Sequence, residues 1–420
     1  MTAFMKNRYF QGMLVGLLVS ALFFSVLFAG YVRSNSIQSA EGNNGSTNLT
    51  TEADSDNSLM SKAVKSKLNR IKSIIDTYYL DEINEDKMVE GMYKGLVSSL
   101  EDPYSVYYTK DEFAALMESS SGSYCGIGAY VSQDVKTGVI TIVKPFEGGP
   151  AYKAGMLPGD IIYKVSGEEA TGKDLSEIVS KMKGEEGTTV DLEIIRAGES
   201  DPIKLTIERR TVEVPTISYE MLDNKVGYIQ IAEFDEVTGP QFRSAITDLD
   251  NQGMKGLVID LRNNPGGLLD TVCDMLDRML PEGLIVYTED KNGTRTEEVK
   301  STAEESFDKP LVVMINGNSA SASEVFAGAI QDYGIGTILG TTSFGKGIVQ
   351  SVIPLSDGSG VKVTVSKYYT PKGRNIHEIG IEPDVVVELK DKLKTKVVID
   401  KSEDNQLQEA IKIINEKSSK

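Results

Sequence analysis

Three short stretches decide the fold: L-V-V-M-I at 311–315, N-S-A-S-A-S-E at 318–324 and S-F-G-K-G at 343–347. The first is an apolar run typical of a fully buried strand. The second predicts a helix start, because Ser321 and Glu324 fit a capping box and apolar residues follow at helical spacing. A strand, a small-residue turn and a helix in this order place a serine hydroxyl where backbone N–H groups of the helix N-terminus point outward. The stretch therefore predicts an α/β core with room for an oxyanion site.

The pattern alone leaves two interpretations of Ser321, a serine that only caps the helix or a nucleophile. A serine nucleophile needs a base that takes its proton. The chain contains one histidine, His377, and nothing in the sequence pairs it with a carboxylate. Lys346 is the other candidate, because it lies in a Gly-Lys-Gly turn and a lysine buried among apolar groups loses its proton more easily.

These residues resemble the carboxy-terminal processing proteases, also called tail-specific proteases, which are Ser/Lys peptidases. The resemblance rests on the Ser-Ala-Ser-Ala-Ser-Glu run, the Phe-Gly-Lys-Gly turn and a glutamine four residues after the lysine, in the same order and spacing. It implies that Ser321 is the nucleophile, that Lys346 is the general base and that Gln350 orients the base.

The same resemblance implies an oxyanion hole. In the family, one N–H comes from a glycine of a turn rich in Asn, Pro and Gly, and the other comes from the residue after the nucleophile. The turn here is R-N-N-P-G-G at 262–267, so the donors are Gly267, with Gly266 as the alternative, and Ala322. Two such donors stabilise a tetrahedral oxyanion. Neither a cofactor nor a metal is implied.

A PDZ domain is also predicted, because G-P-A-Y-K-A-G-M-L-P-G-D-I-I at 149–162 is similar to the interior of that domain. Gly126, Ile127 and Gly128 resemble its carboxylate-binding loop. Backbone N–H groups of such a loop hold a terminal carboxylate while the peptide adds to the sheet edge. A helix predicted over 175–182 flanks the groove. Joined to a Ser/Lys site, this domain implies capture of protein or peptide substrates by an exposed, mostly apolar C-terminus.

The N-terminal segment predicts a membrane anchor. Residues 12–32 carry no charge and are long enough for roughly 30 Å of helix. A cleaved signal peptide is the alternative, but its apolar core is usually shorter and the small-x-small cleavage site is poor here. Lys6 and Arg8 precede the segment, so the positive-inside rule leaves the N-terminus in the cytoplasm and the catalytic part outside the cell membrane.

Composition limits the remaining possibilities. The net charge of −18 excludes nucleic acid as the main partner. A chain of 420 residues that is 40% hydrophobic is ordinary for two or three folded domains. The spacing of Cys125 and Cys273 suggests neither a metal site nor a disulfide framework.

The sequence thus predicts a multidomain protein of α/β and α+β class, in which a PDZ domain joins a βαβ-type Ser/Lys protease core, with N-terminal helices and one transmembrane helix. The βαβ pattern consists of strands 226–231 and 256–261 around a helix at 239–251. By resemblance the N-terminal helices contribute to a homodimer. The predicted segments are a cytoplasmic N-terminus (1–11), the anchor (12–32), a flexible linker (33–58), a helical domain (59–117), the PDZ domain (118–210), the protease core (211–392) and a C-terminal helical segment (393–420).

The expected function is that of a membrane-anchored serine endopeptidase that recognises substrate C-termini and cleaves through an acyl-enzyme. The alternative is a non-catalytic, membrane-tethered receptor for C-terminal peptides. A PDZ domain alone would favour the receptor, whereas Ser321, Lys346 and Gln350 together favour the enzyme.

Overall fold

The computed structural model describes residues 59–302, 304, 306–396 and 398–418, and the chain divides into two compact units, residues 1–83 and 84–420. The predicted cytoplasmic segment, anchor and linker therefore lie outside the described residues. Among the residues that are described, no helix combines the length and the apolar character that crossing a bilayer requires. The described part of the first unit contains α2 (Lys62–Tyr78), which Ser61 caps through a hydrogen bond from the Val64 N–H.

The second unit contains the predicted βαβ unit, which is confirmed as β11 (Val226–Ile231), α7 (Thr238–Asn251) and β12 (Gly256–Asp260). The two strands are parallel neighbours in a six-stranded sheet with the order β10-β11-β12-β15-β16-β19. Only the β10–β11 pair is antiparallel. The other strands of this sheet are β10 (Ile217–Met221), β15 (Leu311–Ile315), β16 (Thr337–Gly340) and β19 (Val385–Val386).

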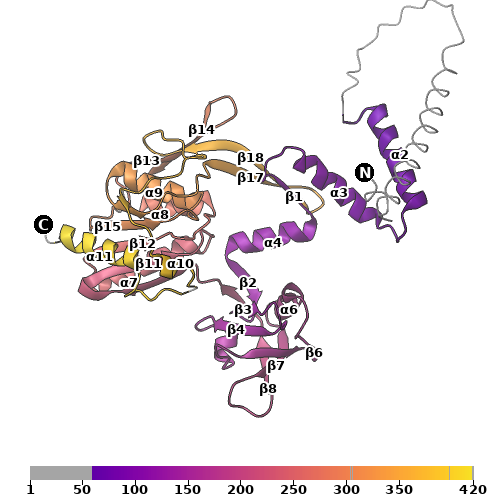
Figure 1. Cartoon of the computed structure of the whole chain (residues 1–420), viewed down its shortest axis with the longest axis horizontal. Coiled ribbons are helices and arrows are strands. Elements are labelled where there is room, and N and C mark those ends of the chain that lie inside the picture. Colours follow the sequence, from indigo (N-terminus) through magenta and orange to yellow (C-terminus); the bar gives the residue numbers. More distant parts are fainter. Residues whose placement is uncertain (1–58, 303, 305, 397, 419–420) are drawn as a thin grey trace, which may run out of the picture. The chain divides into compact units, whose positions relative to one another are not determined.

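Both faces of this sheet are covered, which explains why its central strands are continuous apolar runs. In β12, Leu257 and Ile259 belong to the core shared with α7, α8 (Leu269–Asp277) and α9 (Ala322–Tyr333). Val258, which lies between them, belongs to the opposite core beneath α11 (Asn405–Ser418). Figure 1 shows α11 on the strands of this sheet, in agreement with the predicted terminal helix.

A second, five-stranded antiparallel sheet carries the segment that follows the Gly-Lys-Gly turn. β17 (Ile348–Pro354) and β18 (Gly360–Tyr369) form an antiparallel hairpin in this sheet. β1 (Val106–Tyr108) pairs with β18 on its other edge, so the region between α3 (Glu85–Ser98) and α4 (Lys110–Ser121) is built into the core. The remaining strands are β13 (Gly283–Glu289) and β14 (Arg295–Ser301).

The region predicted as a PDZ domain has its own sheet and its own core. Its strands pair antiparallel in the order β3-β4-β5-β7-β8, and the buried side chains include Ile140, Ile162 and Ile194. The helix predicted over 175–182 is confirmed as α6 (Leu175–Met182). The other elements are β2 (Ser123–Gly126), β3 (Ala129–Gln133), β4 (Ile140–Pro145), α5 (Pro150–Lys153), β5 (Ile161–Val165), β6 (Glu168–Glu169), β7 (Thr189–Ile195), β8 (Ile203–Glu208) and β9 (Arg210–Glu213).

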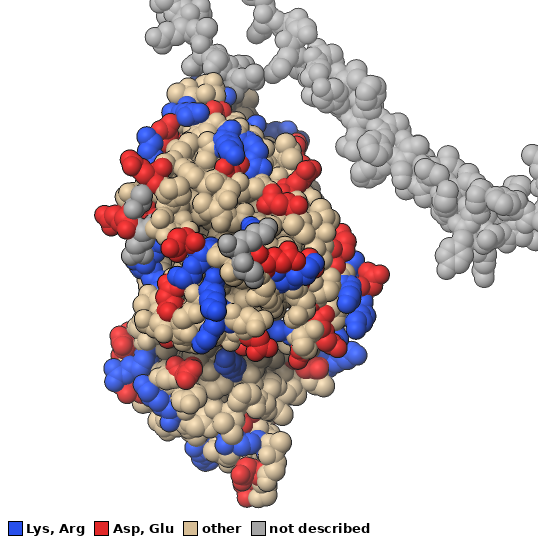
Figure 2. Space-filling model, turned by 90° about the vertical axis from the view of Figure 1, so that its left-hand side faces the viewer, with Lys and Arg blue, Asp and Glu red and all other residues tan. Residues whose placement is uncertain are grey.

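Acidic and basic side chains are interspersed on the face of the molecule shown in Figure 2. Ion pairs at the surface of the described residues include that of Lys181 with Glu168. Exposed pairs of this kind contribute little to stability individually. The excess negative charge is therefore not gathered into a single acidic area on this face.

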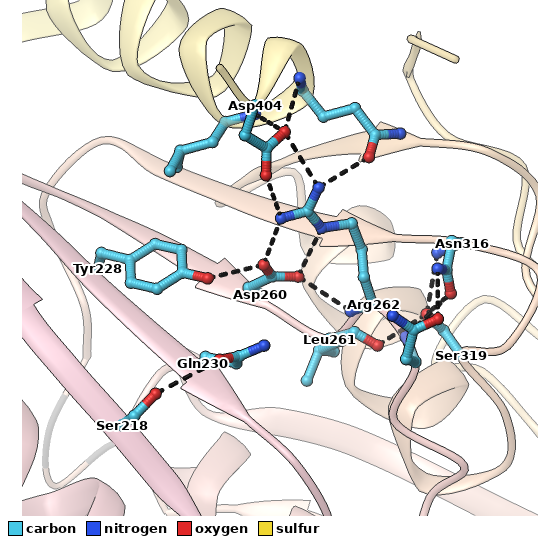
Figure 3. A network of polar contacts seen from close by, with 12 residues as sticks. Ser218, Tyr228, Gln230, Asp260, Leu261, Arg262, Asn316, Ser319 and Asp404 are labelled. Carbon is cyan, nitrogen blue, oxygen red and sulfur yellow. Dashed lines mark hydrogen bonds and ion pairs between the residues drawn. The ribbon is translucent and has the colours of Figure 1, made fainter. Parts of the chain in front are cut away.

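A buried ionic cluster ties α11 to the end of β12 (Figure 3). The Arg262 guanidinium donates to the Asp260 carboxylate at 2.9 and 2.6 Å and to the Asp404 carboxylate at 3.2 and 2.7 Å. The Tyr228 hydroxyl donates to Asp260 at 2.8 Å. Burial acts to lower the pKa of Arg262, but the two carboxylates more than offset this effect and raise it. The cluster fixes the first residue of the 262–267 turn, which leads to the predicted oxyanion glycines.

Replacing Arg262 by leucine is expected to destabilise the core by about 3–5 kcal/mol, because the carboxylates of Asp260 and Asp404 would remain buried without their partner. Arg243→Leu is the matched control, since Arg243 pairs with Asp274 at an exposed position, and should cost at most about 1 kcal/mol. Urea unfolding followed by circular dichroism measures both. Equal losses for the two variants would contradict the role of the cluster.

Candidate active site

Ser321 lies at the junction of the 316–321 turn and α9, in an unusual backbone conformation. Its φ of 54° and ψ of −115° are rarely adopted by a residue with a side chain, and such strain persists only where the surroundings enforce it. Of the predicted capping box with Glu324, the hydrogen bond from the Ser321 N–H to the Glu324 carboxylate is present, at 2.8 Å. The Ser321 side chain makes no capping hydrogen bond, so its hydroxyl is not committed to the helix.

The Glu324 carboxylate joins the serine turn to the lysine turn. Glu324 is fully buried, and one of its oxygens accepts the N–H groups of both Ser321 and Lys346, each at 2.8 Å. The other oxygen accepts the Ser343 hydroxyl at 2.5 Å and the Gly345 N–H at 2.7 Å. A buried carboxylate with four donors is well satisfied. It therefore holds the backbones of Ser321 and Lys346 on the same side of the core, close to each other.

Lys346 has the properties of a lysine that can lose its proton. Burial lowers its pKa, and the positive charge of Lys362 lowers it further, while Asp102 and Glu324 act in the opposite direction. The Lys346 Nζ lies 4.6 Å from the centroid of the Tyr104 ring. Within the described residues it makes no hydrogen bond to Ser321.

Gln350 does not contact Lys346 through a hydrogen bond in the described part of the chain. Its Nε2 lies 3.4 Å from the Ile348 carbonyl oxygen and 3.5 Å from the Thr364 hydroxyl oxygen, which are long contacts. Gln350 nevertheless lines the same small cavity as Ser321, of about 140 Å³. Gln350 thus lies beside the serine. The structure of the described residues shows no direct contact through which it would orient Lys346 in the way that the sequence predicted.

Two backbone N–H groups at this cavity make no hydrogen bond to any described residue, namely those of Gly267 and Ala322. Both residues line the cavity together with Ser321. The N–H of Gly266, the alternative donor, is occupied by the Asn264 side chain at 2.8 Å. Gly266 instead allows close approach, because a Cβ atom there would lie 2.8 Å from the Ser321 Cβ. The available pair of donors is therefore Gly267 and Ala322.

Comparison with known proteins identifies the family of the chain. Residues 225–387 match peptidase family S41, residues 141–196 match the PDZ domain, and residues 25–112 match the N-terminal domain of the activating protease CtpB. The carboxy-terminal processing protease CtpA of Bacillus subtilis is 39% identical over 374 residues, which are 89% of this chain and 78% of the relative. The chain belongs to the carboxy-terminal processing proteases.

Two further relatives belong to the same family. The carboxy-terminal processing protease CtpB of Bacillus subtilis is 34% identical over 374 residues, covering 87% of this chain and 76% of the relative. The solved structure of a photosystem II D1 C-terminal processing protease is 31% identical with a TM-score of 0.45, covering 77% of this chain and 87% of that chain. The match to peptidase family S41 and the two Bacillus subtilis relatives show that this carboxy-terminal processing protease is a serine-type peptidase with a PDZ domain, and they do not support the alternative of a non-catalytic receptor.

The PDZ domain of the protease has a groove of about 280 Å³ whose lining includes β3, α6 and the predicted carboxylate loop. Gly126 ends β2, the Ile127 side chain is buried and lines the groove, and Gly128 has a φ of 72°. The carbonyl oxygens of Ile127 and Gly128 accept the N–H groups of Ala151 and Phe146, which fixes the loop. The Tyr124 hydroxyl lies against the N–H groups of Gly128 and Ala129.

Several residues at the two sites of the protease escaped the sequence reasoning. Glu324 was interpreted only as a helix cap, although its carboxylate also reaches the lysine turn. Tyr368 was not singled out, although its hydroxyl donates to the Lys346 carbonyl oxygen and contacts the Ser321 side chain. Tyr104 and Tyr124 carried no signal, because aromatic residues in loops and short strands have no periodic pattern that assigns their contacts.

Glu324→Gln is expected to lower kcat/KM by about 10- to 100-fold, because the amide nitrogen cannot accept the N–H groups that the lost oxygen accepted, and the two turns would shift. Stability should fall by about 2–5 kcal/mol. Glu382→Gln, at an exposed position of the neighbouring loop, is the matched control and should change neither quantity. Steady-state cleavage and urea unfolding test this, and an unchanged kcat/KM in Glu324→Gln would contradict it.

Proposed function

We propose that this carboxy-terminal processing protease cleaves proteins with a Ser321/Lys346 dyad through an acyl-enzyme. The observation that carries the proposal is the single Glu324 oxygen that accepts the N–H groups of both residues. This oxygen brings two residues together. One is a serine with a strained backbone whose hydroxyl makes no capping hydrogen bond, and the other is a lysine with a lowered pKa. A nucleophile with a positioned base is the arrangement that covalent catalysis requires.

The proposed reaction begins when neutral Lys346 takes the proton of the Ser321 hydroxyl. The Ser321 Oγ then attacks the substrate carbonyl carbon, and the N–H groups of Gly267 and Ala322 stabilise the resulting oxyanion. The Lys346 ammonium returns the proton to the leaving amine, and the ester is later hydrolysed by water that Lys346 deprotonates. The side chain of Lys346 must first approach Ser321, which its flexible four-carbon stem allows.

We infer that the PDZ groove selects substrates with an exposed apolar C-terminus. Its lining is largely apolar, and a peptide that adds to the edge of β3 would direct its last side chain toward the residues of α6. The carboxylate would be held by N–H groups of the loop at Gly126, Ile127 and Gly128. The Tyr124 hydroxyl lies against the N–H groups of Gly128 and Ala129, so it would have to move away when the carboxylate binds there.

We further propose that residues 12–32 anchor the protease in the cell membrane with the catalytic part outside, and that the N-terminal helices support a homodimer. The anchor is supported by the uncharged sequence of that segment. The dimer is supported by apolar side chains that are exposed on both helices. They include Ile71 and Ile74 of α2, and Met92, Tyr93 and Leu96 of α3.

Ser321→Ala and Lys346→Arg are each expected to reduce cleavage at least about 1,000-fold, since one lacks the nucleophile and the other carries a guanidinium that stays charged. Ser356→Ala and Lys367→Arg change an exposed serine and an exposed lysine, and should retain activity. The assay uses the full chain in detergent with an unfolded protein that ends in apolar residues.

Activity of the unmodified protease should rise with pH, because only the neutral amine acts as a base and its fraction grows as pH increases. The lowered pKa of Lys346 moves this rise below the range of an ordinary lysine. Cleavage that persists in Ser321→Ala would contradict the nucleophile, and activity independent of pH between about 6 and 9 would contradict the base.

Val179→Arg is expected to weaken peptide binding at least about tenfold, because a charge would enter the apolar groove. Val143→Arg is the control, because Val143 is exposed on β4 and does not line the groove. Fluorescence anisotropy with a labelled peptide ending in apolar residues measures both, and C-terminal amidation of the peptide should weaken binding similarly. Equal binding by the two variants would overturn the assignment of the groove.

A further inference from the structure

The ammonium group of Lys346 lies on the face of the Tyr104 ring, 4.6 Å from its centroid. The negative potential of an aromatic face attracts a cation and offers nothing comparable to a neutral amine. Tyr104 comes from the segment between α3 and β1, far from Lys346 in the sequence. The contact therefore favours the protonated lysine, which cannot act as a base.

A hydrogen-bond network fixes the segment that carries Tyr104. The Asp102 carboxylate accepts the Tyr104 N–H at 3.0 Å, the Ser105 hydroxyl at 2.6 Å and the Thr364 hydroxyl at 2.7 Å. The Ser105 hydroxyl accepts the Thr364 N–H at 3.1 Å. Since Thr364 lies on β18 and β1 pairs with the same strand, the backbone at Tyr104 is anchored to the core.

The groups around Lys346 act on its ammonium form in opposite directions. Lys362 and burial disfavour its ammonium form, whereas Asp102 and Glu324 favour it. Lys362 itself lies over another ring of the same segment, that of Tyr108, at 5.5 Å. The Glu324 carboxylate is already occupied by four donors. The Tyr104 ring is thus the uncharged partner that determines where the ammonium rests.

We infer that Tyr104 is a positioning residue that holds Lys346 as an ammonium in a resting place, and that the lysine must leave this ring before it can deprotonate Ser321. The inference rests on the proposed function, in which Lys346 is the base. It adds that the segment before β1, which pairs with the protease sheet but comes from the N-terminal part of the chain, sets the protonation and position of that base. Displacement of the Tyr104 ring would release the amine for catalysis.

Tyr104→Leu removes the ring and should shift the ascending limb of the kcat/KM profile to lower pH by about half a unit. Cleavage near pH 7 should rise about threefold. Tyr104→Phe keeps an aromatic face and should leave the limb in place. Tyr108→Leu is the matched control, because it removes the ring beneath Lys362 in the same segment and should also leave the limb in place.

Replacing Tyr104 by trifluorophenylalanine provides a test if the leucine variant fails to fold, because fluorination weakens the negative potential of the face while keeping the shape of the ring. It should shift the limb in the same direction as leucine, relative to Tyr104→Phe. An unmoved limb in the folded variants, or a loss of kcat/KM at every pH without a shift, would overturn the inference. Full activity of Lys346→Arg would instead refute the base itself, so the two failures are distinguishable.

Discussion

One buried carboxylate determines the geometry of the active site. Glu324 has no exposure to solvent, and its charge is tolerable only because four donors converge on it. One of these donors belongs to the serine turn and three belong to the lysine turn at 343–347, and a helix and a strand separate the two turns in the sequence. The backbone positions of the proposed nucleophile and base are therefore set by a carboxylate that takes no part in the proposed chemistry. Movement of either turn would remove hydrogen-bond donors from that buried carboxylate.

Because of these hydrogen bonds, the backbone of Lys346 is fixed while its side chain can move. The backbone of Lys346 is held by Glu324 and by Tyr368, whose hydroxyl donates to the Lys346 carbonyl oxygen. The charged end of the long lysine stem, in contrast, lies on the face of Tyr104 and makes no hydrogen bond that fixes it to another described residue. A change between a resting and an active enzyme would then need only rotations about the side-chain bonds of Lys346. The backbone of the core would stay in place.

The sequence predicted the parts of the protease that depend on periodicity and on local turns. Strands β11, β12 and β15 and helix α7 were readable because apolar runs and helical spacing repeat over several residues. The roles of the serine, the lysine and the N–H groups of Gly267 and Ala322 were inferred from short motifs that resemble those of the family, and they stay predictions. Contacts such as that of Thr364 with Asp102, which are 262 residues apart, follow no local pattern and needed the fold.

The cluster around Arg262 also has a consequence for biosynthesis. Asp404, which completes it, is synthesised 142 residues after the arginine. At roughly 5–20 residues per second, a ribosome needs on the order of ten seconds to cover that distance. During this interval Arg262 can pair with Asp260 but lacks the second of its two carboxylate partners. The attachment of the 262–267 turn to the C-terminal helix is therefore completed late in synthesis.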